Sequence, residues 1–237
     1  MGKRILTLIL TLVLLVALPA AALAATTGGD KGGTVTVTGH AELTVVPDIA
    51  YITTGIVTTG ADVESARREN ERAMRRIIDA VTALGIDKNN VKTAQFSLQP
   101  VYKNDTKDGT AGAIGGYRLV NSLTVAVEDL EKIGPVIDAA FQAGANQFQG
   151  LRFAVKNDGK LRDELLRLAV QDGRHKAAVM AEALGLTLGP PQAVTEAGRY
   201  SPVQADNYRS LKAVANGTPI EAGTLTVGMD VNLTFGL

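Results

Sequence analysis

The sequence predicts an α+β protein in which antiparallel sheets are covered by helices on one face. Residues 34–46 and 225–235 alternate apolar and polar side chains with period two, which is typical of strands with one buried face. Residues 61–84 and 161–184 repeat apolar side chains at three-four spacing, which indicates amphipathic helices. The order strand, helix, strand, long loop, strand occurs twice, over 49–117 and 148–235. It suggests two copies of one strand–helix–hairpin unit.

Turn and helix-cap residues set the bounds of the expected elements in the first half of the chain. A capping pair of Thr59 and Asp62 would begin the first helix, and Gly85 would end it in a left-handed conformation. In the strand that follows this helix, Ala94, Phe96 and Leu98 share one face. The expected elements are strands over 34–46, 49–58, 91–102 and 117–128, the helix over 61–84, and a long loop over 103–116.

The second half repeats this organisation. Pro135 conflicts with a helix that begins at Asp129, so the helix either begins at Pro135 or is bent there. The third helix has an apolar stripe of Leu161, Leu165, Leu168, Val179 and Leu184. The expected elements are strands over 148–156, 191–197 and 225–235, helices within 129–143 and over 161–184, and a second long loop over 198–222.

The amino-terminal residues have the features of a secretory signal. Lys3 and Arg4 precede a short apolar run, Pro19 interrupts it, and Ala22 and Ala24 are the small residues that signal peptidase reads. A membrane anchor is the alternative, but the run is shorter than the roughly 20 residues that a span needs. We therefore expect cleavage after residue 24, a flexible leader over 25–33 and one domain over 34–237. The mature chain would be periplasmic, bound within the cell envelope, or extracellular, with no membrane span.

Composition excludes several kinds of chemistry. The chain has no cysteine, so disulfides, thiolate ligands and cysteine nucleophiles are absent. Cleavage after residue 24 leaves 22 basic against 24 acidic residues. That balance gives no electrostatic reason to bind nucleic acid. His40 lies near Glu42 on the polar face of the first strand, but the other histidine, His175, is distant in sequence. We expect no metal, no cofactor and no catalytic residue.

The second long loop contains the candidate contact residues. Arg199, Tyr200, Tyr208 and Arg209 are residue types that are enriched at interfaces. Packing of this loop onto the protein's own sheet is the alternative. We also expect self-association through strand edges and both long loops, because the first and last strands are long, contain no internal proline and have mostly threonine on their outer faces.

Several short segments together resemble the SIMPL-domain family, which includes YggE-like exported proteins. The matching segments are 35–39, 46–50, 91–93, 98–102, 116–117, 121–125, 134–144, 150–153 and 221–223. The resemblance implies an exported α+β domain, a link to envelope or oxidative stress and, in some members, ring-like homo-oligomers. It supplies no catalytic residue. One departure is Gly173-Arg174-His175, where members continue an Ala-rich helix, and glycine costs about 1 kcal/mol of helix propensity there.

The sequence thus favours an exported, non-enzymatic binding or scaffold protein that self-associates, and an unknown protein partner is also compatible with it. The alternative is an enzyme, for example a hydrolase, whose site no motif reveals.

Overall fold

Two antiparallel sheets, each with helices on one face, make up the fold. The computed structural model describes residues 33–103, 112–204 and 218–237, with the backbone alone for 198–204. Over these residues, one sheet has four strands in the order β3-β4-β2-β5 and the other has three in the order β1-β7-β6. All neighbouring strands run antiparallel. The expected α+β class is confirmed.

The elements agree with the expected order, and most bounds shift by a few residues. The strands are β1 Thr34–Val45, β2 Ile49–Gly60, β3 Val91–Tyr102, β4 Ile114–Val127, β5 Gln147–Ala154, β6 Pro191–Gln204 and β7 Leu225–Gly236. The helices are α2 Val63–Ala83, α3 Ile133–Gln142 and α4 Gly159–Ala183, with 3-10 turns at Lys88–Asn90 and Leu130–Lys132.

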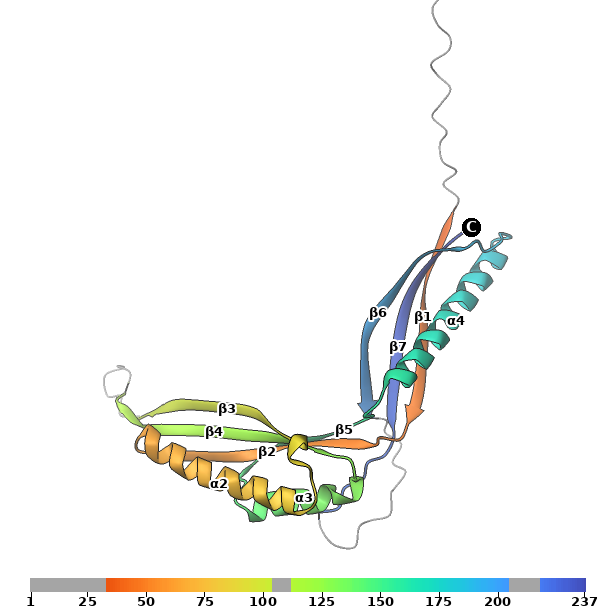
Figure 1. The fold of residues 1–237 in the computed structure, drawn as a ribbon. Helices are drawn as coiled ribbons and strands as arrows, with labels where there is room; N and C mark the ends of the chain where they lie inside the picture. The colour runs from red at the N-terminus through yellow and green to blue at the C-terminus, as the bar shows by residue number, and fades with distance from the viewer. Residues whose placement is uncertain (1–32, 104–111, 205–217) are drawn as a thin grey trace, which may run out of the picture.

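Each sheet has its own hydrophobic core. In the four-stranded unit (β2 to β5 with α2 and α3), the core lies between the two helices and one face of the sheet, and it includes Ile52, Ile77 and Val136. In the three-stranded unit (β1, β6 and β7 with α4), α4 packs on β1 and β7 around Leu165 and Leu233. Figure 1 shows the two units at an angle in an elongated molecule, with the carboxyl end at the far tip of the three-stranded unit.

The start of α2 corrects one expected contact. The capping box joins Asp62 and Ser65: the Ser65 N–H donates to Asp62 Oδ1 at 2.7 Å, and the Asp62 N–H donates back to Ser65 Oγ at 3.4 Å. Thr59 lies inside β2, so the predicted Thr59–Asp62 pair is wrong. At the other end, Gly85 has φ +83°, which confirms the left-handed stop.

Pro135 lies in the first turn of α3, where a missing N–H interrupts no helical hydrogen bond. The preceding residues Leu130–Lys132 form a 3-10 turn, so the regular helix begins at Ile133, two residues before the proline.

The long helix α4 is continuous through Gly173, and its buried face differs from the expected stripe. The buried residues follow i, i+4 spacing: Leu165, Ala169, Gly173, Ala177 and Ala181. Val179 and Leu184 are 51% and 66% exposed, so the predicted apolar stripe is wrong at these two positions. The small residues explain the difference, because they let the helix backbone approach Gly39 of β1; a Cβ atom on Gly39 would lie 1.9 Å from the Ala169 carbonyl oxygen.

Two strands exchange places relative to the expected repeat. The order strand, helix, hairpin does recur along the chain as β2-α2-β3-β4 and β5-α4-β6-β7. In space, however, β5 pairs with β2 in the four-stranded sheet, and β1 takes the position beside β7. The two copies are therefore equivalent in sequence order but not in strand pairing.

Candidate functional site: the free edge of the four-stranded sheet

Strand β3 forms an edge of the four-stranded sheet that no other described element covers. It pairs with β4 on one side, while α2 lies along β2 and β4. All residues of β3 except Val91 and Ser97 are exposed. The outer N–H and C=O groups of such a strand are unpaired, and another extended backbone is their natural partner.

A bulge and a proline limit the regular part of this edge. The register against β4 shifts between Thr93 and Gln95, so Ala94 is the extra residue of a bulge. Pro100 has no N–H to donate, which restricts it to an edge position. Five residues between them, Gln95 to Gln99, pair regularly with Ser122 to Arg118 of β4. The segment 95–99 is the part of the edge that can accept a new strand in register.

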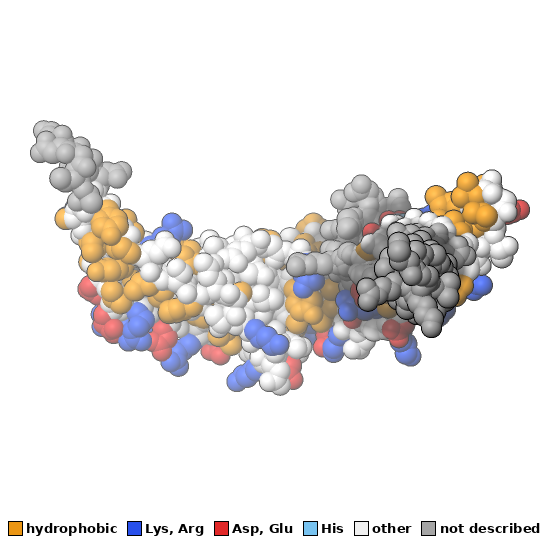
Figure 2. Space-filling model, turned by 90° about the horizontal axis from the view of Figure 1, so that it is seen from above, with side chains coloured by type: hydrophobic (Ala, Val, Ile, Leu, Met, Phe, Trp, Pro, Cys, Tyr) orange, Lys and Arg blue, Asp and Glu red, His pale blue; other side chains and the backbone are white. Residues whose placement is uncertain are grey.

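An apolar groove runs beside this segment, between β3 and α2. Its volume is about 280 Å³. Phe96 is 64% exposed on the edge side of the groove, and Leu98, on the same face of β3, is 39% exposed. Figure 2 shows hydrophobic side chains gathered on the four-stranded unit, at the left of the view. The groove is lined by Arg67, Asn70, Glu71, Met74, Arg75, Ile78, Phe96, Leu119 and Asn121.

A buried amide pair fixes the inner end of the groove. Asn70 on α2 is only 1% exposed. Its Nδ2 donates to Thr58 Oγ1 at 3.3 Å and lies 3.5 Å from the Ile56 carbonyl oxygen, and its Oδ1 accepts from Asn121 Nδ2 at 2.9 Å. The Thr58 hydroxyl donates to the Ala66 carbonyl at 2.9 Å. These bonds tie α2 to β2 and β4, so the helix side of the groove is rigidly placed.

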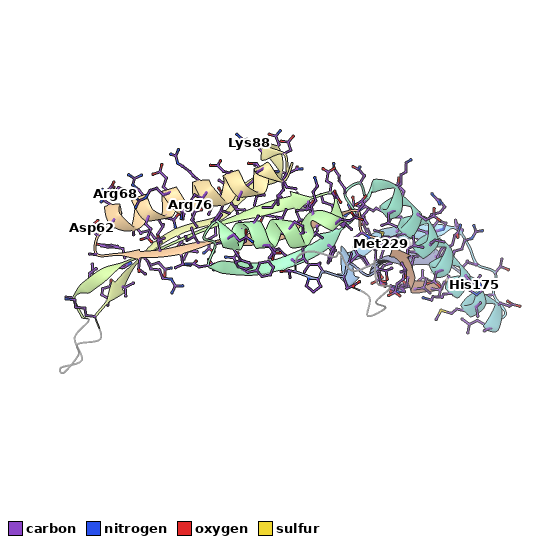
Figure 3. The ribbon with its side chains drawn as sticks, turned by 90° about the horizontal axis from the view of Figure 1, so that it is seen from below. Asp62, Arg68, Arg76, Lys88, His175 and Met229 are labelled. Carbon is purple, nitrogen blue, oxygen red and sulfur yellow. The ribbon has the colours of Figure 1, made fainter. Side chains whose placement is uncertain are left out.

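The charged flank of α2 is neutralised within the helix. Arg67 binds Glu64 at 2.9 Å and Glu71 at 3.2 Å, and Arg75 binds Glu71 at 2.5 Å. The hydrogen bond from Arg75 lowers the pKa of Glu71, and that from Arg67 lowers the pKa of Glu64. Figure 3 places Arg68 on the outer side of the same helix, whereas Arg76 donates from Nε to the Ala143 carbonyl oxygen at 3.3 Å. These ion pairs lie on a solvent-exposed face of α2, where acidic and basic side chains alternate.

The edge of β1 is blocked, in contrast to that of β3. The His40 N–H donates to Asp172 Oδ2 at 2.7 Å, and Lys176 Nζ donates to the Thr38 carbonyl at 3.0 Å. Asp172 and Lys176 belong to α4 and form an ion pair at 2.6 Å, which lowers the pKa of Asp172. In an antiparallel ladder these backbone groups face away from β7, so α4 caps the free edge of β1.

The last strand is not an edge either. β7 lies between β1 and β6, and all of its odd-numbered residues from Leu225 to Phe235 are buried. Of the two long, regular strands that motivated the expected self-association, β7 is therefore central and offers no edge, and β1 is an outer strand that is capped at Thr38 and His40. The described sheets have four outer strands, β1, β3, β5 and β6, and of these β3 is the one that contributes a side chain, Phe96, to the groove.

His40 lies between two carboxylates on the open face of the three-stranded sheet. Its Nδ1 is 2.6 Å from Asp230 Oδ1, and its Nε2 is 3.3 Å from Glu42 Oε1. The pKa of His40 is raised above its ordinary 6.5, chiefly by the hydrogen bond with Asp230 and further by Glu42. Both ring nitrogens are thus engaged. Over the described part of the chain, no group of three His, Asp or Glu side chains is arranged to hold a metal.

We predict that Asp230→Asn lowers the pKa of His40 toward 6.5, because it removes the hydrogen bond that contributes most to the shift. The stabilisation from this cluster is complete below pH 6.5 and is lost as the pH rises through the raised pKa of His40. An NMR titration of the His40 ring protons measures this pKa in the unsubstituted protein and in Asp230→Asn. Glu42→Gln serves as a comparison in which a smaller decrease is expected. An unchanged midpoint in Asp230→Asn would contradict the assigned cause.

The predicted contact residues are not brought together by the described structure. Arg199 and Tyr200 lie in β6, which continues to Gln204, so residues 198–204 form a strand where a loop was expected. Tyr208 and Arg209 lie outside the described residues. His175 is on α4, far along the molecule from the groove (Figure 3). No helix in the described ranges is long and apolar enough to cross a membrane.

The β3 edge was missed because sequence alternation alone cannot distinguish it from a half-buried strand. Phe96 and Leu98 suggested a buried face, but α2 stops short of β3 and leaves both side chains exposed. Pro100 was the available signal, since proline within a strand favours an edge position.

Comparison with known proteins decides the family. The model of SIMPL, described as a protein of unknown function (DUF541), matches residues 35–235, which span both sheets from β1 to β7. The chain belongs to the SIMPL family. Among SIMPL relatives, the 26 kDa periplasmic immunogenic protein of Brucella melitensis is 30% identical over 211 residues, covering 85% of this chain and 83% of the relative.

Two further SIMPL relatives are called uncharacterized protein YggE. That of Escherichia coli K12 is 26% identical over 189 residues, covering 79% of this chain and 74% of the relative. That of Edwardsiella ictaluri is 27% identical over 164 residues, covering 69% and 68%.

Proposed function

We propose that the mature chain is a non-enzymatic binding or scaffold protein of the cell envelope that self-associates. Export is supported by the signal-like leader and by the word "periplasmic" in the names of the Brucella relatives. A link to envelope or oxidative stress remains an expectation from the family resemblance. Without cysteine, any such link would not rest on thiol chemistry.

The open edge of β3 is the observation that carries this proposal. Natural proteins usually cover, shorten or charge their edge strands. In this chain the Asp172–Lys176 pair caps β1, whereas β3 keeps an uncovered regular segment with two exposed apolar side chains beside a groove. The contrast between the edges of β1 and β3 supports a partner strand at β3 and none at the capped part of β1.

The solution mass of the mature chain tests self-association. Light scattering over a concentration series is expected to give a particle larger than one chain. The second loop was predicted over 198–222, but 198–204 belong to β6 and Ala222 belongs to the core, so the deletion is placed within 205–217, outside the described residues. It is expected to reduce the particle size without unfolding the domain. A mass that stays at one chain up to high concentration contradicts the proposal, and an unchanged assembly after the deletion excludes the second loop from it.

The non-enzymatic part of the proposal rests on the side-chain inventory. The chain has two histidines and no cysteine, and the described geometry occupies both nitrogens of His40 with carboxylates. An unbiased activity screen on the purified mature chain tests this part. Turnover that persists through purification and is lost on a point substitution in one pocket would favour the alternative, a hydrolase or other enzyme.

A further inference from the structure

The regular segment of the β3 edge has a nearly palindromic order of side chains. It reads Gln95-Phe96-Ser97-Leu98-Gln99, with a bulge before it and Pro100 after it. Polar, large apolar, small polar, large apolar and polar side chains follow one another in either direction. An antiparallel strand of the same sequence therefore matches this segment position by position.

Self-pairing about Ser97 gives favourable cross-strand neighbours. Gln95 would face Gln99 of the second copy, Phe96 would face Leu98, and Ser97 would face itself. The segment contains no charged side chain, so no like charges stand directly opposite within it. Aromatic–aliphatic pairs stabilise antiparallel sheets, whereas like charges directly opposite destabilise them.

We propose that β3 pairs with β3 of a second copy of this chain, antiparallel and about a two-fold axis at Ser97. The inference rests on the proposed self-association and specifies its surface. Joining two four-stranded sheets in this way makes one continuous eight-stranded sheet with α2 of each copy on the same face. The interface is isologous, because the same segment serves both sides.

The groove beside α2 explains why this pairing buries apolar surface. Phe96 and Leu98 lie on the α2 face of β3, and α2 does not reach over them. In the pair, these two side chains from each copy form one apolar band between the two α2 helices. The groove is thereby closed by the second copy. The arginines at its rim already bind Glu71, so the approach of the second helix desolvates no unpaired carboxylate there.

The first test removes the apolar band. Phe96→Lys places a charge in the proposed interface, and the exposed position makes loss of the fold an unexpected result. Leu184→Lys is the matched control, because Leu184 is 66% exposed on the other unit. At equal concentration, light scattering should show the particle mass of Phe96→Lys falling by about twofold or more, and that of Leu184→Lys unchanged. Circular dichroism confirms that both chains are folded.

The second test determines the register by disulfide crosslinking. Because the chain has no native cysteine, any disulfide must involve the introduced residue. Residues directly opposite in an antiparallel pair have Cα atoms about 4.5–5.5 Å apart, within reach of a disulfide. Ser97→Cys alone should therefore give a covalent dimer under mild oxidation. Gln99→Cys alone should not, since its counterpart lies four residues away, roughly 13 Å along the strand. Mixing Gln95→Cys with Gln99→Cys chains should restore the crosslink between differently tagged copies.

The outcomes separate this inference from the proposed function. Crosslinking at Ser97 and in the mixed pair, with dissociation by Phe96→Lys, supports the two-fold pairing. A larger particle that survives Phe96→Lys and gives no Ser97 crosslink overturns the pairing but leaves self-association intact. A wild-type mass of one chain at every concentration, with no crosslink, overturns both. Equal crosslinking of Ser97→Cys and Gln99→Cys alone overturns the register.

Discussion

Gly39→Ala is expected to destabilise the three-stranded unit by about 3 kcal/mol, because the new methyl group meets backbone that cannot move independently. The added Cβ would lie 1.9 Å from the Ala169 carbonyl oxygen and 2.7 Å from the Gly173 nitrogen. Relief requires α4 to move away from β1. That movement would open the core around Leu165 and Leu233 and disturb the Asp172 and Lys176 contacts to the edge of β1.

Urea denaturation of the two chains measures this effect, and Gly159→Ala is the matched control. Gly159 is the first residue of α4, and a Cβ there meets nothing within 4 Å. The control should change the free energy of unfolding by only a few tenths of a kcal/mol. Similar unfolding midpoints for Gly39→Ala and Gly159→Ala would mean that α4 leaves room for a methyl group at Gly39, which contradicts the close contact between α4 and β1.

Asn70→Asp is expected to destabilise the four-stranded unit by about 3 kcal/mol at neutral pH, because it buries an acceptor and a charge where a donor is needed. The amide nitrogen of Asn70 faces the Ile56 carbonyl and Thr58 Oγ1, and the Thr58 proton is already donated to Ala66. A carboxylate oxygen in that place meets two acceptors. Asn70→Ala should cost less, about 1–3 kcal/mol, for the partners left unpaired.

The pH dependence distinguishes the two Asn70 variants. Burial raises the folded-state pKa of the introduced carboxyl, so the folded state binds the proton more tightly than the unfolded state. The destabilisation of Asn70→Asp should therefore decrease as the pH falls through that raised pKa, while that of Asn70→Ala should not. Urea titrations at several pH values measure this, with exposed Asn89→Asp as the control. A pH-independent loss in Asn70→Asp would contradict the acceptor–acceptor explanation.

Local patterns predicted the fold class and most elements because each depends on near neighbours in sequence. The period-two alternation of β1 and β7 and the glycine stop at Gly85 are such signals, and the structure confirms them. The stripe of α4 failed because residue size, not hydrophobicity alone, decides which face packs. Gly173 and its alanine neighbours are buried, whereas the larger Val179 and Leu184 remain exposed.

Strand pairing and the candidate site could not be predicted because they depend on contacts between distant residues. Nothing local to β5 indicates that it pairs with β2, or that β1 crosses to β7. The capping of β1 likewise needs Asp172 and Lys176 to meet Thr38 and His40 across more than a hundred residues. The groove exists only because α2 reaches β4 but not β3, which no periodicity encodes.

The placement of β1 beside β7 has a consequence for the order in which the emerging chain folds. His40 and Asp230 are 190 residues apart, and β7 is the central strand to which both β1 and β6 attach. Nearly all of the four-stranded unit lies between β1 and β7 in sequence. Most of this unit can therefore fold before β7 is available to pair with β1. Its core is completed by Ala222 and Leu225, at the entrance to β7. The arrival of the carboxyl-terminal segment thus closes both units at once, and loops of such length slow folding. Until then β1 is an unpaired, half-apolar strand, which makes the chain vulnerable to aggregation during folding.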